Sequence, residues 1–314
     1  MKRFKVHSPG AFTTVQDNGR FGYQKMGMPI SGALDAFAFR VANLLVGNPA
    51  ESAVLEITIT GPRLEFLSET DIALTGAKMG MTLNDTLVQA WRSVRVKPGD
   101  MLEIHQVTSG CRAYLAISGG IDVPVVMGSR STYVGGKLGG FEGRPLQADD
   151  VVNGLEARLL EAPRVLPNKW IPEHKREINL RIIPGPQDDY FDTGLETLLT
   201  TDYMVTPKAD RMGYRLQGAA IERIPGTPAS IVSEPSMPGG IQIPADAQPI
   251  VLLVEQTVGG YSKIATVITP DIARLTQATP GDTARFEKVD LAQAHKIYRD
   301  SEKKLQEIAA SLTM

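Results

Sequence analysis

Glycine and proline residues are spread along this whole chain, and they limit the folds that it can adopt. The sequence has 30 Gly and 21 Pro residues among its 314. The alternating segment 93–97 stops at Pro98-Gly99-Asp100, and the apolar segment 179–183 stops at Pro184-Gly185-Pro186. Short strands joined by tight turns follow from such punctuation. We therefore predict a mainly β chain with a few helices (α+β).

Further strands are predicted where short apolar or alternating runs meet turn residues. They lie at 71–75, 101–104, 113–117, 249–254 and 284–287.

Helical periodicity appears in few places. Segment 36–46 carries apolar residues on one face, with Asp35 as the predicted N-cap and Gly47 just past the end. A short helix is predicted at 193–199. The clearest helix begins after Asp290, its predicted cap. Its apolar residues follow three-and-four spacing: Leu291, Ala294, Tyr298, Leu305, Ile308 and Leu312.

A proline-dense stretch divides the chain. Pro163, Pro167 and Pro172 lie close together, and proline fixes φ and removes a backbone donor, which suits a semi-rigid connector. We expect an N-terminal β-rich domain at 1–162, a connector at 163–177, a C-terminal β-barrel domain at 178–289 and a terminal helix at 290–314.

Composition and charge exclude several classes of protein. The net charge of −2 lacks the basic excess of a non-specific nucleic-acid binder. The single cysteine, Cys111, excludes an intrachain disulfide. The start of the chain has no apolar stretch after its basic residues. The most apolar run, at 249–254, is far below the about 20 residues of a membrane span. We expect a soluble cytoplasmic protein.

Common catalytic motifs are absent from the sequence. It contains no G-x-S-x-G nucleophile elbow, and the glycine-rich segment 135–140 lacks the Ser or Thr that follows lysine in a phosphate-binding loop. The four histidines are scattered without metal-ligand spacing, so no metal site is expected.

Two polar, glycine-bracketed segments are the candidate site. The first, at 13–35, has neither helix nor strand period, and its glycines allow polar groups to approach a ligand closely. The second, at 235–263, surrounds a buried strand with amides and a lysine, which suit a planar amide or urea group beside an anionic group. A hydrogen-bonded structural loop and a solvated lysine are the alternatives. The side chains of interest are Gln16, Asp17, Arg20, Tyr23, Gln24 and Ser31 in the first segment, and Gln242, Gln248, Gln256, Tyr261 and Lys263 in the second.

The same segments carry a family resemblance. Thr14-Val15-Gln16-Asp17 with Gly19-Arg20, and Pro238-Gly239-Gly240-Ile241-Gln242 with Gly259-Gly260-Tyr261-x-Lys263, resemble the signatures of the allophanate hydrolase subunit 2 family. This family is also called biotin-dependent carboxyltransferase-like. It includes the C subunit of 5-oxoprolinase, which the chain resembles most, and a sporulation-kinase inhibitor antagonist. The resemblance extends to about residue 288.

The resemblance implies a fold and an activity. It implies two cyclophilin-like, β-barrel-like units. It also implies an ATP-dependent 5-oxoprolinase complex, which converts 5-oxo-L-proline to L-glutamate and whose other members are a B-like and an A-like partner protein. In the urea amidolyase branch the corresponding domain moves a carboxyl group from carboxybiotin to urea, so biotin is the cofactor of that alternative.

Site roles follow from the chemistry that the resemblance implies. Negative charge developing on a carbonyl oxygen needs fixed donors. Arg20, Gln242 and Lys263 are the predicted catalytic donors, and Asp17 is the candidate base. Gln16, Tyr23, Gln24, Ser31, Gln248, Gln256 and Tyr261 are predicted to bind substrate. We expect Arg20 to meet Gln242 and Lys263 in one cleft.

Two departures from the family pattern are visible. Ala247 replaces a turn glycine in Asp246-Ala247-Gln248-Pro249, and Glu255 replaces a basic residue before Gln256. If that basic residue contacts an anionic group, the substrate differs from the usual one.

Three functions remain open at this stage. The leading one is a member of an oxoprolinase complex that is inactive alone. The second is a carboxyltransferase for urea or a related amide. The third is a non-catalytic regulator that binds a kinase-inhibitor protein.

Overall fold

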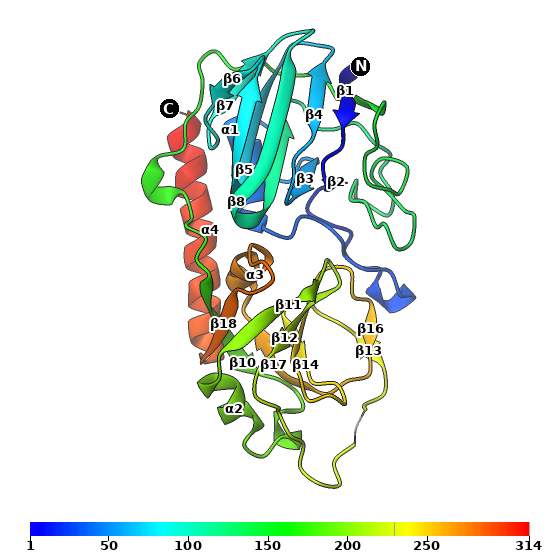
Figure 1. The fold of residues 1–314 in the computed structure, drawn as a ribbon, viewed down its shortest axis with the longest axis vertical. Helices are drawn as coiled ribbons and strands as arrows, with labels where there is room; N and C mark the ends of the chain where they lie inside the picture. Colours follow the sequence, from blue (N-terminus) through cyan, green and yellow to red (C-terminus); the bar gives the residue numbers. More distant parts are fainter. Residues whose placement is uncertain (229, 314) are drawn as a thin grey trace. The chain divides into compact units, whose positions relative to one another are not determined.

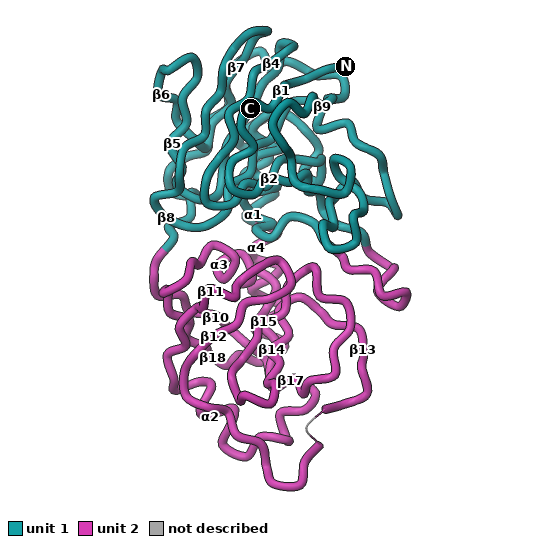
Figure 2. Tube along the Cα trace, turned by 45° about the vertical axis from the view of Figure 1, so that its right-hand side comes forward, with its two compact units in different colours: residues 1–20, 31–174, 304–314 teal, residues 21–30, 175–303 magenta. Residues whose placement is uncertain are grey.

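The computed structural model describes residues 1–228 and 230–313, which form two compact units. Unit 1 contains residues 1–20, 31–174 and 304–313, and unit 2 contains residues 21–30, 175–228 and 230–303. Figure 2 colours them teal and magenta. The predicted boundaries at 162, 177 and 289 stay a prediction.

Unit 1 is built on a nine-stranded sheet with the order β2-β3-β8-β4-β1-β9, and β5 pairs with β6, β7 and β8. All its neighbouring strands are antiparallel. The strands are β1 (Lys2–Ser8), β2 (Phe12–Gln16), β3 (Val54–Thr58), β4 (Arg63–Phe66), β5 (Thr70–Leu83), β6 (Thr86–Val88), β7 (Ser93–Val96), β8 (Met101–Ile117) and β9 (Val151–Asn153).

Two long strands form the centre of this sheet. β5 and β8 pair from Ile72↔Ile117 to Leu83↔Leu102, with irregular register around Lys78. The separate strands predicted at 101–104 and 113–117 are therefore one strand. The sequence between them is polar, which is why its apolar pattern breaks although its backbone still pairs. The apolar face of the sheet packs into a buried core that includes Phe4, Leu55 and Leu115.

Helix α1 (Ala36–Leu45) covers part of this sheet. Its cap is the predicted one, because Asp35 Oδ1 accepts a hydrogen bond from Ala38 N–H at 2.9 Å. Gly47 follows the helix with φ 77°, as predicted for its end. Tyr114 Oη accepts from Asp35 N–H and donates to Glu56, and burial raises the pKa of this tyrosine.

Unit 2 is a closed barrel with the order β10-β17-β14-β15-β12-β11-β18. The pair β10–β18 is parallel and closes the barrel, and the other pairs are antiparallel. The strands are β10 (Glu177–Pro184), β11 (Tyr203–Ala209), β12 (Gly213–Gln217), β14 (Gly240–Gln242), β15 (Ile250–Leu252), β17 (Lys263–Val267) and β18 (Thr283–Lys288); β13 (Glu234–Pro235) and β16 (Val258–Gly259) form a separate two-stranded sheet.

The remaining helices are short, except the last. Asp290 caps α4 (Leu291–Thr313) by accepting from Gln293 N–H at 2.7 Å, as predicted. Residues 291–303 of α4 belong to unit 2, and its last residues belong to unit 1. The other helices are α2 (Gly194–Thr200), α3 (Thr269–Thr276) and the 3-10 turns η1 (Gln24–Met26), η2 (Asn168–Trp170) and η3 (Asp188–Tyr190).

The predicted fold class is confirmed: the chain is mainly β, with barrel-like units and a C-terminal helix (Figure 1). The sheet of unit 1 forms a half-barrel, whereas the barrel of unit 2 closes. Across residues 1–228 and 230–313, no helix has both the length and the apolar character that crossing a membrane requires.

Candidate functional site

Two of the predicted site residues face each other on neighbouring strands of unit 2. Gln242 on β14 is the register partner of Lys263 on β17. The register is irregular between Ile241 and Gln242, and a Cβ built on Gly240 of the same strand would lie 3.9 Å from Lys263 Cδ. The short strands between glycines therefore bring the amide and the ammonium together, although the two residues lie far apart in the sequence.

Two buried polar atoms converge near Gly259. A Cβ built on this glycine would lie 2.5 Å from Gln242 Nε2 and 3.3 Å from Ser236 Oγ. Gln242 is 3% exposed and Ser236 2% exposed. Within the described part of the chain, neither atom has a hydrogen-bond partner. A buried polar group left unsatisfied costs about 1–3 kcal/mol, so this pair of donors is typical of a ligand-binding site.

Lys263 supplies the positive charge of this cluster. Its side chain is 10% exposed, and Nζ forms an ion pair with Glu234 on β13. Its backbone is also fixed, because Lys263 N–H donates to Gln187 Oε1 at 3.0 Å. The solvated lysine that the sequence left open is thus excluded. We call Glu234, Ser236, Gln242, Gly259 and Lys263 the Gln242 cluster.

Sequence reasoning missed Glu234 and Ser236 as site residues. Ser236 lies inside the segment at 235–263, where a serine among prolines and glycines gives no distinct signal. Glu234 lies 29 positions from Lys263. Only the pairing of β13 with β16, which sets Glu234 opposite Gly259, brings it to the site.

The other predicted residues of the second segment are held by backbone contacts or exposed. Gln248 Oε1 accepts from Gly218 N–H at 2.9 Å, and Gln256 Nε2 donates to Val258 O at 2.8 Å. Tyr261 is 44% exposed. Their substrate-binding role stays a prediction.

The two departures from the family pattern have structural outcomes. Ala247 has φ 58°, the left-handed conformation that a glycine adopts without strain. Glu255 is buried, and its Oε1 accepts from Arg211 Nε at 2.5 Å. The Glu255 carboxylate is therefore paired with the guanidinium of Arg211, which also belongs to unit 2.

The first polar segment begins on strand β2 (Phe12–Gln16), where no strand was predicted, and continues in unit 1 as a tightly bonded loop at 17–20. The Asp17 carboxylate accepts four hydrogen bonds, from Gly19 N–H, Arg130 N–H and the hydroxyls of Ser129 and Ser131. A carboxylate offers about four lone-pair sites. This arrangement favours a loop-holding role for Asp17 over that of a base.

The neighbours of Asp17 are equally enclosed. Gln16 is fully buried and bonds Thr14, Thr132 O and Gly32 N–H. Arg20 is also fully buried, and its Nη2 donates to Ser131 O at 2.6 Å. Ser31 is 1% exposed with φ 55°.

Tyr23 and Gln24 lie in the segment 21–30, which belongs to unit 2, and both are half-buried. The convergence of Arg20 with Gln242 and Lys263 in one cleft stays a prediction.

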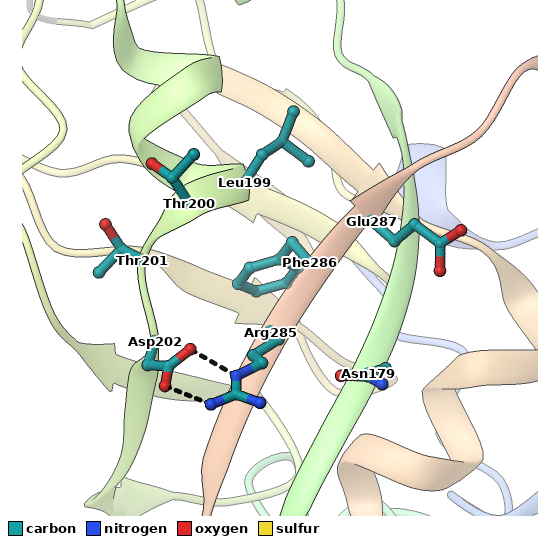
Figure 3. Close-up of a pocket in the computed structure, with 8 residues that line it drawn as sticks. All are labelled: Asn179, Leu199, Thr200, Thr201, Asp202, Arg285, Phe286 and Glu287. Carbon is teal, nitrogen blue, oxygen red and sulfur yellow. Dashed lines mark hydrogen bonds and ion pairs between the residues drawn. The ribbon is translucent and has the colours of Figure 1, made fainter.

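A surface recess of about 370 Å³ lies elsewhere in unit 2, beside α2 and β18 (Figure 3). Asp202 and Arg285 face each other there with Nε···Oδ1 at 2.6 Å. Both side chains are about half exposed and neutralise each other. The Gln242 cluster is the stronger candidate because its buried donors still lack partners within the described residues.

Comparison with known proteins gives a consistent answer. Residues 26–288 match the family model described as "Carboxyltransferase domain, subdomain A and B". The chain is 37% identical to the 5-oxoprolinase C subunit of Escherichia coli K12 over 309 residues, which cover 97% of each chain. It is 34% identical to urea amidolyase of Lachancea kluyveri, covering 94% of this chain but 17% of that protein.

A solved structure extends the likeness to three dimensions. The crystal structure of the K. lactis urea amidolyase superposes with a TM-score of 0.92 at 34% identity, over 98% of this chain and 20% of that one. The chain thus spans about a fifth of that enzyme. The family match covers more than half of the sequence, so this chain belongs to the family of carboxyltransferase domains with subdomains A and B.

Proposed function

We propose that this chain is the C subunit of an ATP-dependent 5-oxoprolinase, which converts 5-oxo-L-proline to L-glutamate together with a B-like and an A-like partner protein. One observation carries the proposal: the chain matches the E. coli C subunit over 97% of both chains. It is inactive alone, and ATP is used by the complex.

The Gln242 cluster supports an amide substrate. Opening a cyclic amide places negative charge on the carbonyl oxygen, and fixed donors in a dry site stabilise that charge. Gln242 Nε2 and Ser236 Oγ are buried donors near one point, and Lys263 adds an ammonium. In this proposal Gln242 and Ser236 hold the carbonyl oxygen, and Lys263 supplies positive charge beside them.

The loop around Asp17 has a supporting part in the proposal. Arg20 remains a proposed donor and Asp17 a proposed member of the site. Gln16, Tyr23, Gln24 and Ser31 are proposed to shape the pocket, with Gln248, Gln256 and Tyr261 from the second segment. The four hydrogen bonds of Asp17 favour a positioning role for it.

The test reconstitutes the complex from its three proteins and measures 5-oxoproline-stimulated ATP hydrolysis and glutamate release. Activity is expected only when this chain is present. Gln242→Ala is expected to lower kcat/KM by about 100-fold, as for the loss of one donor to an oxyanion. Equal activity with the chain omitted contradicts the proposal.

A second candidate is carboxyl transfer from carboxybiotin to urea or a related amide. The likeness to the K. lactis urea amidolyase structure favours it. The buried donors also fit biotin, since its ureido carbonyl accepts hydrogen bonds of the kind that Gln242 and Ser236 offer. Transfer to urea that is lost in Lys263→Ala would support this candidate over hydrolysis.

A further inference from the structure

The pairing of Lys263 with Glu234 joins two unlike side chains. The Lys263 side chain is 10% exposed and lies on β17 of the closed barrel. The Glu234 side chain is 47% exposed and lies on β13, outside the barrel. A nearly buried ammonium therefore depends on an anion that comes from the surface of unit 2.

Glu234 is carried by a small structural element. The β13–β16 arm, residues 231–236 with 257–260, has only two register pairs, Glu234↔Gly259 and Pro235↔Val258. Two further backbone hydrogen bonds join its ends, Ile231 to Gly260 and Ser236 to Thr257. Both views draw it at the rim of unit 2, apart from the barrel strands (Figures 1 and 2). A two-stranded element of this size has little stability of its own.

The arm also carries one of the buried donors, Ser236 Oγ, and lies against the other, Gln242 Nε2. Gly259 belongs to the arm, and Gln242 Nε2 and Ser236 Oγ both lie within 3.3 Å of its built Cβ. Those two atoms have no hydrogen-bond partner among the described residues. The arm thus places the Glu234 carboxylate on Lys263 and brings Ser236 Oγ and Gly259 next to Gln242 Nε2.

Separation would have a different cost for each of the two charged groups of the Lys263–Glu234 ion pair. An ammonium that is nearly buried needs a counterion, because desolvation disfavours its charge. A half-exposed carboxylate regains water when it leaves, so it loses little. Another carboxylate that brings its own acceptor for the free donors would replace Glu234 at a net gain.

We propose that Glu234 holds the place of a ligand carboxylate on Lys263, and that the Gln242 cluster takes a small molecule with a carboxylate next to an amide or ureido carbonyl. The ligand carboxylate pairs with Lys263 after Glu234 leaves. The ligand carbonyl accepts from Gln242 and Ser236. This inference rests on the proposed function, because 5-oxoproline has both groups and urea has only the carbonyl.

Binding to the full chain tests the inference directly. Isothermal titration with 5-oxo-L-proline and with 2-pyrrolidinone, which lacks the carboxylate, compares wild type, Glu234→Gln and the control Glu222→Gln, a glutamate of the same unit outside the cluster. Glu234→Gln removes the competing charge and is expected to bind 5-oxo-L-proline about tenfold more tightly. The affinity of 2-pyrrolidinone should stay unchanged in all three proteins, and the control should behave as wild type.

Three results would overturn the inference. They are unchanged or weaker binding of 5-oxo-L-proline by Glu234→Gln, an equal gain in affinity for 2-pyrrolidinone, or no binding of 5-oxo-L-proline by wild type or Glu234→Gln. The reconstituted complex separates this inference from the proposed function. Turnover of 5-oxoproline with no affinity change in Glu234→Gln removes the inference alone. A selective affinity gain for the carboxylate without turnover by the complex removes the oxoprolinase assignment alone.

Discussion

At the scale of single residues, the Gln242 cluster depends on the absence of a side chain at Gly259. Gly259 has no Cβ, and that atom would lie 2.5 Å from Gln242 Nε2. The amide therefore keeps its position only because this residue is glycine. A substitution at Gly259 can therefore perturb the cluster without changing any of its polar side chains.

Gly259→Ala is expected to rotate the Gln242 amide away and lower kcat/KM of the reconstituted complex by about 100-fold, as the loss of a fixed donor does. The melting temperature should stay near wild type, because the displaced atom is the end of a flexible side chain. Gly80→Ala is the control and should keep wild-type activity, because the nearest atom to its new Cβ, on His105, is 3.2 Å away. Wild-type activity in Gly259→Ala would contradict the role of the amide.

Ala247 is a second residue at which the backbone conformation determines how a substitution changes stability. Its φ of 58° is strained for any residue with a Cβ. Ala247→Gly is expected to stabilise unit 2 by about 0.5–1 kcal/mol, the relief of strain less the greater entropy of glycine in the unfolded chain. Thermal denaturation should show a rise of a few degrees. A lower melting temperature would mean that the left-handed turn is not strained.

At the scale of elements, ion pairs fix the chain beside the edge strand β9. Arg144 donates to both oxygens of Asp150, at 2.8 and 2.9 Å, and Gln147 N–H adds a third bond at 2.7 Å. Burial of Asp150 opposes its ionisation, but the bonds from Arg144 and Gln147 outweigh burial and lower its pKa below 3.8.

Asp150→Asn is therefore expected to destabilise the protein at pH 7 by on the order of 1 kcal/mol. A lowered folded pKa gives stabilisation that is full above the unfolded pKa, near 3.8, and is lost as pH falls through the folded pKa. The gap in melting temperature between wild type and variant should thus narrow as the pH falls below 3.8. A gap that widens on acidification would contradict this assignment.

Local sequence predicted α1, α2, α4 and strands such as β5, β7 and β10, but not β1–β4, β11, β12 or α3. Asp35 caps α1 and Asp290 caps α4 because a capping residue bonds the first turn that follows it. β8 was predicted only at its two ends, since its polar middle pairs with β5 through register alone.

At the scale of the whole molecule, α4 contributes to both units. Ile308 is fully buried in a cluster with Phe39 and Tyr114 of unit 1. Ile297, earlier in the same helix, packs with Ile268 and Val289 of unit 2. One helix therefore stabilises two cores.

Ile308→Ala is expected to cost about 2–4 kcal/mol, because it leaves a cavity in a close-packed core. Hydrogen exchange should show lost protection in β5 and β8, while the barrel strands of unit 2 keep theirs. Ile297→Ala is the matched control, with the effect reversed between the units. Equal loss in both units from either variant would contradict this division of the helix.

The sequence by itself determined the mainly β class and the capped helices and singled out Gln242 and Lys263 as candidates, because turn chemistry, periodicity and motif residues act over a few positions. The tertiary structure alone decided that Glu234 pairs with Lys263, that Ser236 joins Gln242 at Gly259 and that Glu255 is neutralised by Arg211. Those contacts join residues far apart in the chain. Strand pairing sets them, and no local pattern records which strands pair.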